Sequence, residues 1–304
     1  MSRRVKIWIG VALFLAVIVL FGVLFHGHQN NVYQPQNEFK LDDWITIKLG
    51  SLDLSITKAV LYLFLAMIAT IGTMVYVARR MVDPPNRVQA GVEGIYGLIH
   101  DNIAGPNNID RKMAVKWFPF IGTLFLFIWY SNLLGYIPLP TDTEYKFNLF
   151  GLHVPGFAIY AATANISVTL ALTLVVVISY HVEGIRAKGL IRYVKGWLPG
   201  GLDNVPMRWI LIPGIFVIEV ISQFVRIISL SVRLFANVLA GHLLILFMGG
   251  GLVVLLGLAA LGILTLPIAV VFFLFEVVLI ATLQAFIFAT LTAIYLGGAV
   301  AESH

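Results

Sequence analysis

The chain has 304 residues, of which 60% are hydrophobic and only 12% are charged, and its formal net charge is +5. Soluble domains carry roughly 25% charged residues, so this composition excludes an ordinary soluble protein and indicates an integral membrane protein. The sequence contains no cysteine, which excludes disulfide bonds, thiolate metal sites and clusters held by cysteine.

Six apolar regions follow one another along the chain. The first four have about 19 to 23 residues, enough to cross a hydrocarbon core of ~30 Å at ~1.5 Å per residue, and the last two are about twice as long. The regions are residues 7–25, 59–78, 117–137, 158–180, 209–248 and 251–296. The sequence therefore predicts an all-α, multi-span membrane protein of about six helices.

The first apolar region follows three basic residues and is interpreted as a signal anchor or a signal peptide within residues 1–30. No small-x-small cleavage site follows it, which favours an uncleaved anchor. An extracytoplasmic segment would then occupy residues 31–57, and a membrane domain would occupy residues 58–298, with long helices at about 209–248 and 252–296.

Basic residues gather in the connections 79–116 and 182–208, whereas 26–57 and 138–157 are richer in acidic residues. The positive-inside rule places the N-terminus and both basic connections in the cytoplasm. One crossing per apolar region then places the C-terminus there too. The stretch PLPTDTE at 138–144 predicts a turn at a membrane exit.

The region 209–248 is either a hairpin of two spans or one long helix. It contains no proline or glycine between Gly214 and Gly241, and its polar residues recur every three or four positions, which favours one helix with a single polar face. We refer to these residues as the polar stripe; they are Glu219, Ser222, Arg226, Ser229, Arg233 and Asn237.

Arg233 is the residue of this stripe that most needs an explanation. It has apolar sequence on both sides, and an arginine at bilayer depth costs several kcal/mol and keeps its charge. For the serines and Asn237, helix–helix hydrogen bonding explains the pattern equally well. For Glu219 and Arg226, mutual pairing or snorkelling is a sufficient explanation. Arg233 is predicted to be functional.

His242 lies about 180° around the helix from Arg233, so it is predicted to serve a different surface. The final region carries Glu276 in the apolar stretch FFLFEVVLIATLQ, followed by Gln284 and Tyr295. A lone histidine or a neutral, hydrogen-bonded glutamic acid can be purely structural. Together the two residues favour a route for protons. Pro267 predicts a bend or a break within this region.

Two stretches now point to a known family. SLSVRLFANVLAGH at 229–242 and LQAFIFATLTAIYL at 283–296 resemble subunit a of the F-type ATP synthase, and SNLLGYIP at 131–138 and TANISVTLAL at 163–172 match it more weakly. The resemblance covers roughly residues 40 to 298. It implies that the last two helices lie steeply tilted against a rotor ring of small hairpin subunits.

The resemblance also assigns roles to individual residues. It places the family's essential arginine at Arg233, with Gln284 and Asn237 as its matched glutamine and asparagine. The proton pathway would then include the following residues, Asn165 standing where the family has an aspartate: His242, Glu276, Glu219, Ser229, Tyr295 and Asn165.

The spacing of Glu276 departs from the family pattern. The family's partner of His242 usually precedes the glutamine by seven residues, whereas Glu276 precedes Gln284 by eight. One residue rotates a position by about 100° on an ideal helix, so a local bulge or an altered pairing stays open.

The resemblance implies a proton-translocating stator subunit with two aqueous half-channels. Such a subunit catalyses no reaction by itself. Opposite Arg233, a carboxyl of the ring could ionise because an opposite charge favours its charged form. The expected partners are the ring (the c-ring), the peripheral-stalk subunit b, the rest of the complex and the lipid bilayer, in a bacterial inner membrane. No cofactor, metal or nucleic acid is expected, and both protons and sodium stay open as the ion.

Two other functions compete with this interpretation. A proton- or sodium-coupled secondary transporter usually has duplicated halves, and no internal repeat is visible in the sequence. A haem-holding membrane subunit needs axial ligands, and His242 is the only histidine deep in an apolar region. Both alternatives therefore fit the sequence less well.

Overall fold

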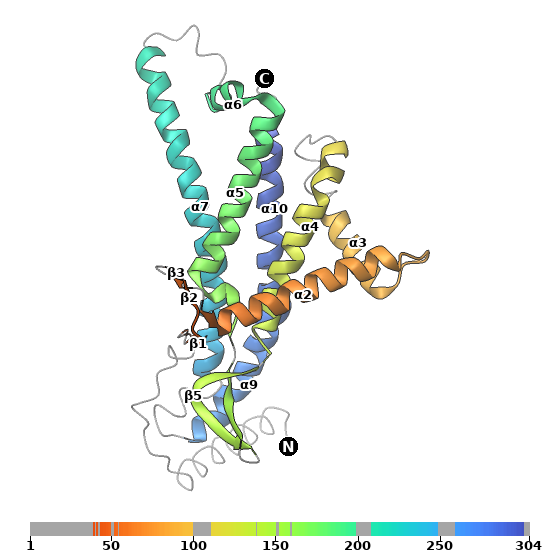
Figure 1. Cartoon of the computed structure of the whole chain (residues 1–304), viewed down its shortest axis with the longest axis vertical. Helices are drawn as coiled ribbons and strands as arrows, with labels where there is room; N and C mark the ends of the chain where they lie inside the picture. The colour runs from red at the N-terminus through yellow and green to blue at the C-terminus, as the bar shows by residue number, and fades with distance from the viewer. Residues whose placement is uncertain are drawn as a thin grey trace, which may run out of the picture. The chain divides into compact units, whose positions relative to one another are not determined.

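The computed structural model describes residues 39, 41, 43–49, 52–53, 55–99, 111–137, 139–149, 152–158, 160–198, 208–248 and 259–300. The predicted anchor at 1–30 and both chain ends lie outside these residues. Within them the chain is mainly helical, as Figure 1 shows. The protein is an all-α membrane protein in class, with a few short strands.

Five described segments are long and apolar enough to cross a membrane. They are Lys58–Arg79, Val115–Leu134, Ile166–Lys188, Leu211–Leu246 and Thr265–Val300. These spans agree with the second to sixth apolar regions of the sequence, and the chain is a multi-pass membrane protein.

The chain divides into two compact units. The first comprises Met1–Lys58, Tyr136–Tyr160 and Asn237–Ile280, and the second comprises Ala59–Gly135, Ala161–Ala236 and Ala281–His304. The second unit contains α3 (Arg87–Ile99), α4 (Arg111–Leu134), α5 (Ile166–Lys188), α6 (Leu190–Lys195) and α10 (Ala281–Val300), together with most of α2 (Lys58–Arg79) and of α7 (Arg208–Leu246).

The core of the second unit forms where α4 and α5 pack against α10, which lies beside both helices in Figure 1. One face of α10 carries a small residue every fourth position, which lets neighbouring backbones approach closely. These buried residues are Ala281, Ala285, Ala289, Ala293 and Gly297.

A buried hydrogen-bond chain joins the segments at one end of this core. The Thr163 hydroxyl donates to Asn132 Oδ1 at 2.6 Å, and Asn132 Nδ2 donates to the carbonyl oxygen of Ala281 at 3.3 Å. Because unpaired polar groups are costly in an apolar core, these bonds fix the relative register of the segments. Both SNLLGYIP and TANISVTLAL contribute to them.

α5 begins later than the sequence suggests. The apolar pattern predicts a helix over 158–180, but α5 spans Ile166–Lys188, and Ala162–Ala164 form a separate 3₁₀ turn (η3). The reason is the side chain of Asn165, whose Oδ1 accepts a hydrogen bond from the Ser167 backbone N–H at 2.8 Å. An asparagine in this position caps and so defines the N-terminus of a helix.

In the first unit the predicted turn in PLPTDTE is wrong. Its residues 139–144 belong to β5 (Leu139–Leu149), which pairs with β6 (Leu152–Ala158) as an antiparallel hairpin. Threonine or an aromatic residue stands at every second position from 141 to 147 of β5, and such residues favour strands. Two shorter pairs precede it, joining β1 (Asp43–Ile45) to β4 (Ile56–Thr57) and β2 (Lys48–Leu49) to β3 (Leu52–Asp53).

α7 is one uninterrupted helix of 39 residues, which confirms the single-helix interpretation of region 209–248 and excludes the hairpin. The described part of the last region, from Ala259 on, also continues as one helical run. α9 (Ala259–Phe275) passes through Pro267 without a break, a π-helix (η6, Glu276–Ile280) follows, and α10 completes the run.

Candidate functional site

The middle of α7 presents an exposed polar line on an apolar surface. Ser229, Arg233 and Asn237 are all exposed, and the large apolar side chains of Ile228 and Val232 are exposed beside them. Arg233 makes no ion pair or hydrogen bond with any other residue that the structure describes. A charged group in such surroundings needs a counter-charge from outside the described residues.

Gln284 and Asn165 differ from Arg233 in their surroundings. Gln284 is buried on α10, and no hydrogen bond joins it to Arg233 among the described residues. Asn165 caps α5, so a structural role accounts for its side chain. The structure thus does not pair Arg233 with its family-matched glutamine.

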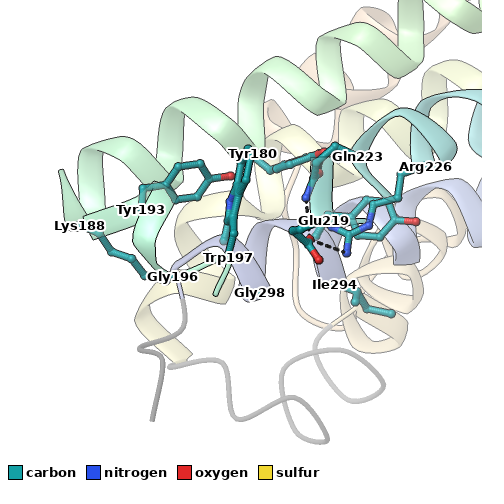
Figure 2. A pocket seen from close by; sticks show the side chains of 12 residues that line it. Tyr180, Lys188, Tyr193, Gly196, Trp197, Glu219, Gln223, Arg226, Ile294 and Gly298 are labelled. Atoms are coloured by element: carbon teal, nitrogen blue, oxygen red, sulfur yellow. Dashed lines mark hydrogen bonds and ion pairs between the residues drawn. The ribbon is translucent and has the colours of Figure 1, made fainter. Parts of the chain in front are cut away.

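A cavity of about 360 Å³ lies in the second unit, and Figure 2 shows the side chains that line it. It brings together Glu219 and Arg226 of α7 with Tyr295 of α10, and Tyr180 of α5 and Gln223 of α7 also line it. Two of these residues, Glu219 and Tyr295, belong to the proton pathway predicted from the sequence. The volume is sufficient for several water molecules.

The polar groups of the cavity form a connected network (Figure 2). Gln223 Nε2 donates to Glu219 Oε1 at 3.0 Å, and the Tyr180 hydroxyl donates to Gln223 Oε1 at 2.8 Å. Arg226 Nη2 lies 3.7 Å from Glu219 Oε1, and its guanidinium lies 5.3 Å from the centre of the Tyr295 ring. The pairing of Glu219 with Arg226 that the sequence offered as an explanation is therefore present.

A second group of candidate site residues is buried in the first unit, and we call it the buried cluster: Tyr136, His242 and Glu276. Their exposed fractions are 5%, 1% and 8%, respectively. The Tyr136 hydroxyl donates to Glu276 Oε2 at 3.0 Å, and the rings of Tyr136 and His242 stack with centroids 4.6 Å apart. The structure thus brings His242 and Glu276, both predicted from the sequence, to the same tyrosine.

The orientation of His242 follows from its hydrogen bond to α7. Its Nδ1 lies 3.0 Å from the carbonyl oxygen of Val238. A carbonyl oxygen only accepts, so Nδ1 carries the proton and donates it. The nitrogen that can bind or release a proton is then Nε2.

Gly241 provides the space for the Glu276 carboxyl. A Cβ atom added at Gly241 would collide with the carboxyl carbon and both carboxyl oxygens of Glu276. The acidic group therefore lies directly against the backbone of α7, and any larger residue at position 241 would displace it.

The structure accounts for the extra residue between Glu276 and Gln284. The π-helix η6 begins at Glu276 and ends at Ile280, inside this interval. A π-helix closes i→i+5 hydrogen bonds and so absorbs an extra residue within an α-helical run. The local bulge that the sequence left open is present, and such bulges are frequent at functional sites.

Sequence reasoning did not identify Tyr136, Gly241, Gln223 or Tyr180 as site residues. Tyr136 lies inside the stretch SNLLGYIP, but nothing in its neighbours along the chain marks it as a partner of Glu276. Burial and the charge of Glu276 raise the pKa of the Tyr136 phenol, so its hydroxyl stays protonated as a donor.

Comparisons with known proteins agree with the sequence motifs. The chain matches the family model described as ATP synthase A chain over residues 60–297. It is 33% identical to ATP synthase subunit a of Rubrobacter xylanophilus over 252 matched residues. The match covers 83% of this chain and 87% of that relative. It is 34% identical over 277 residues to the subunit of Hyphomonas neptunium, covering 89% and 97%. Against the subunit of Paramagnetospirillum magneticum the identity is 35% over 277 residues, covering 88% and 98%.

Proposed function

The chain belongs to the ATP synthase A chain family, and we propose that Arg233 is the fixed cation with which it controls proton exchange on a rotating ring of partner subunits. At the level of the family, the chain is the proton-translocating subunit of the membrane sector of an ATP synthase. Family membership argues against the secondary transporter and the haem-holding subunit.

One observation carries the role of Arg233. Its guanidinium is exposed on an apolar helix surface and has no charged partner among the described residues. A ring carboxyl has to be neutral where it faces lipid, since a charge there is costly. Within about 4–6 Å of Arg233 the same carboxyl can ionise and release its proton. Arginine keeps its charge in apolar surroundings, whereas lysine can lose it.

Two separate routes then supply and remove the protons. We assign one half-channel to the cavity that holds Glu219 and Tyr295, and the other to His242 and Glu276. Ser229 and Asn237 extend the polar stripe beside Arg233, and Gln284 stays a proposed partner of the arginine. Arg233 would stand between the two routes and block direct leakage of protons.

The partners follow from the same role. Arg233 would face the c-ring, subunit b would hold the chain as part of the stator, and the complex would lie in a bacterial inner membrane with both termini in the cytoplasm. Single cysteines introduced by Ser2→Cys and Ser303→Cys should resist a membrane-impermeant thiol reagent added from outside intact cells. Labelling of either position would contradict the orientation.

The decisive experiment replaces Arg233. Arg233→Ala should abolish ATP synthesis driven by an imposed proton gradient in membrane vesicles, while the complex still assembles, because the exposed side chain holds little of the fold together. Arg233→Lys should fail as well, since a lysine can be neutralised. Arg192→Ala, which removes an exposed arginine of α6, serves as the control. Synthesis at the wild-type rate by assembled Arg233→Ala complexes would contradict the proposal.

A further inference from the structure

We propose that Tyr136 is a positioning residue that holds the carboxyl of Glu276 in the orientation needed to exchange a proton with His242. This inference rests on the proposed function, since it concerns the proton route assigned to His242 and Glu276. It adds a third member, from a different part of the chain, to a pair that the sequence had suggested.

The hydroxyl of Tyr136 fixes one oxygen of the carboxyl. It donates to Glu276 Oε2 at 3.0 Å, and both residues are buried. The other side of the carboxyl lies against Gly241, where there is no room for even one additional carbon atom. A glutamate side chain normally samples several rotamers, and these two contacts restrict it. Because Oε2 accepts the hydrogen bond of Tyr136, we assign proton exchange to Oε1.

The ring of Tyr136 is itself held in place, which is a requirement for a positioning residue. Phe273 packs edge-on against it, with centroids 5.8 Å apart and an interplanar angle of 90°. His242 stacks on it at 4.6 Å with an angle of 29°, and Phe39 packs edge-on against His242 at 6.5 Å. One tyrosine thus packs against the imidazole, whose orientation the hydrogen bond to Val238 already fixes, and directs the carboxyl.

The exchange itself leaves Tyr136 unchanged. A proton on His242 Nε2 passes to Glu276 Oε1, which converts imidazolium and carboxylate into neutral imidazole and neutral carboxylic acid. The reverse transfer restores the two charges. His242 Nδ1 stays protonated through the whole cycle, because it donates its hydrogen bond to the carbonyl oxygen of Val238. The Tyr136 hydroxyl keeps its own proton as the donor to Glu276.

The test removes only the hydroxyl. Tyr136→Phe keeps the ring and its stacking but cannot donate to Glu276. Passive proton flux through vesicles stripped of the ATPase head should fall about tenfold per assembled complex, the factor expected for one lost hydrogen bond. The matched control is Tyr130→Phe, which removes the α4 hydroxyl that lies 2.7 Å from Thr73 Oγ1 and outside the cluster. Its flux should equal that of the wild type.

Two further measurements separate positioning from packing. Glu276→Asp retracts the carboxyl by one methylene, beyond reach of the hydroxyl, so Tyr136→Phe should have little additional effect in that background. In infrared spectra of the complex, the carboxyl band that disappears in Glu276→Gln should shift in Tyr136→Phe and stay in place in Tyr130→Phe. If Tyr136 served packing alone, the carboxyl band would stay in place in both Tyr136→Phe and Tyr130→Phe.

The outcomes distinguish this inference from the function on which it rests. If Glu276→Gln slows the flux but Tyr136→Phe leaves both the flux and the carboxyl band unchanged, the positioning role is wrong and the proton route stands. If Glu276→Gln also leaves the flux unchanged, the assignment of the route itself fails. A tenfold loss in Tyr136→Phe with a shifted band and little additional loss in the Glu276→Asp background supports the role.

Discussion

The cavity and the buried cluster use ionisable groups in opposite ways. In the cavity, Glu219 and Arg226 are 30% and 36% exposed, lie 3.7 Å apart and adjoin open space. In the cluster, His242 and Glu276 are almost fully buried and packed against one tyrosine and one glycine. Exposed pairs are screened and tolerate change, whereas buried groups depend on every contact around them.

This difference predicts where substitutions matter. A proton route through open water needs polar walls but no exact geometry, because water molecules rearrange around a changed side chain. A route through buried side chains depends on the distance and direction of each donor and acceptor. Variants of the cluster should therefore have larger effects than matched variants of the cavity.

The largest effect is expected for Gly241→Ala. Its new methyl group would occupy the position of the Glu276 carboxyl, and overpacking of this kind costs about 1–3 kcal/mol. Proton flux and the amount of assembled complex should both fall. Gly214→Ala on the same helix is the control, because a Cβ there meets no described atom within 4 Å. Equal flux in the two variants would mean that Glu276 does not depend on this contact.

The next effect concerns the pair itself. Glu276→Gln and His242→Gln should each slow proton flux about tenfold, and the double variant should lose much less than the product of the two. Non-additivity is expected if both residues serve one transfer, as we propose. The measurement is flux through vesicles without the ATPase head, normalised to assembled complex. Fully multiplicative losses would show that the two residues act independently.

Smaller effects are expected in the cavity. Glu219→Gln and Arg226→Gln should each reduce flux about threefold or less, the range of an exposed ion pair. Both variants keep the polarity and length of the cavity wall, so its water should persist. Ser179→Ala, which removes an exposed hydroxyl bonded to its own helix, is a suitable control. A loss as large as that of Glu276→Gln would contradict the contrast between the two regions.

The smallest effect is expected for Tyr193→Phe at the cavity wall. Burial raises the pKa of the Tyr193 phenol, so the hydroxyl is neutral and its removal takes no charge from the cavity wall. Proton flux between about pH 6 and 9 should match the wild type in rate and in pH dependence. A change in the pH profile would show that this hydroxyl takes part in the route.

Much of the fold could be predicted because it depends on local composition. The apolar runs marked five of the membrane spans, and the spacing of the polar stripe predicted one helix through residues 209–248. The helical period determines which residues share a face of one helix. The nine-residue separation of Arg233 and His242 was therefore sufficient to place them on different sides of α7.

The departures from prediction have local causes of a different kind. Asn165 delays the start of α5 with one side-chain hydrogen bond. Threonine or an aromatic residue at every second position from 141 to 147 favours the strand β5 where a turn was predicted. Proline did not interrupt the last helical run, although Pro267 lies inside α9. The irregular turn lies instead at Glu276–Ile280, where the sequence showed only a spacing of one residue too many.

The sequence by itself determined the membrane class, the long helices and the isolation of Arg233, because hydropathy and periodicity are properties of neighbouring residues. Only the tertiary structure decided that Tyr136 meets Glu276 and that the carboxyl lies against Gly241. Likewise, only folding joined Glu219, Tyr180 and Tyr295 around one cavity. Such contacts link residues far apart in the chain, and they form because the packing of helices, not the order of the residues, sets which side chains share a buried space.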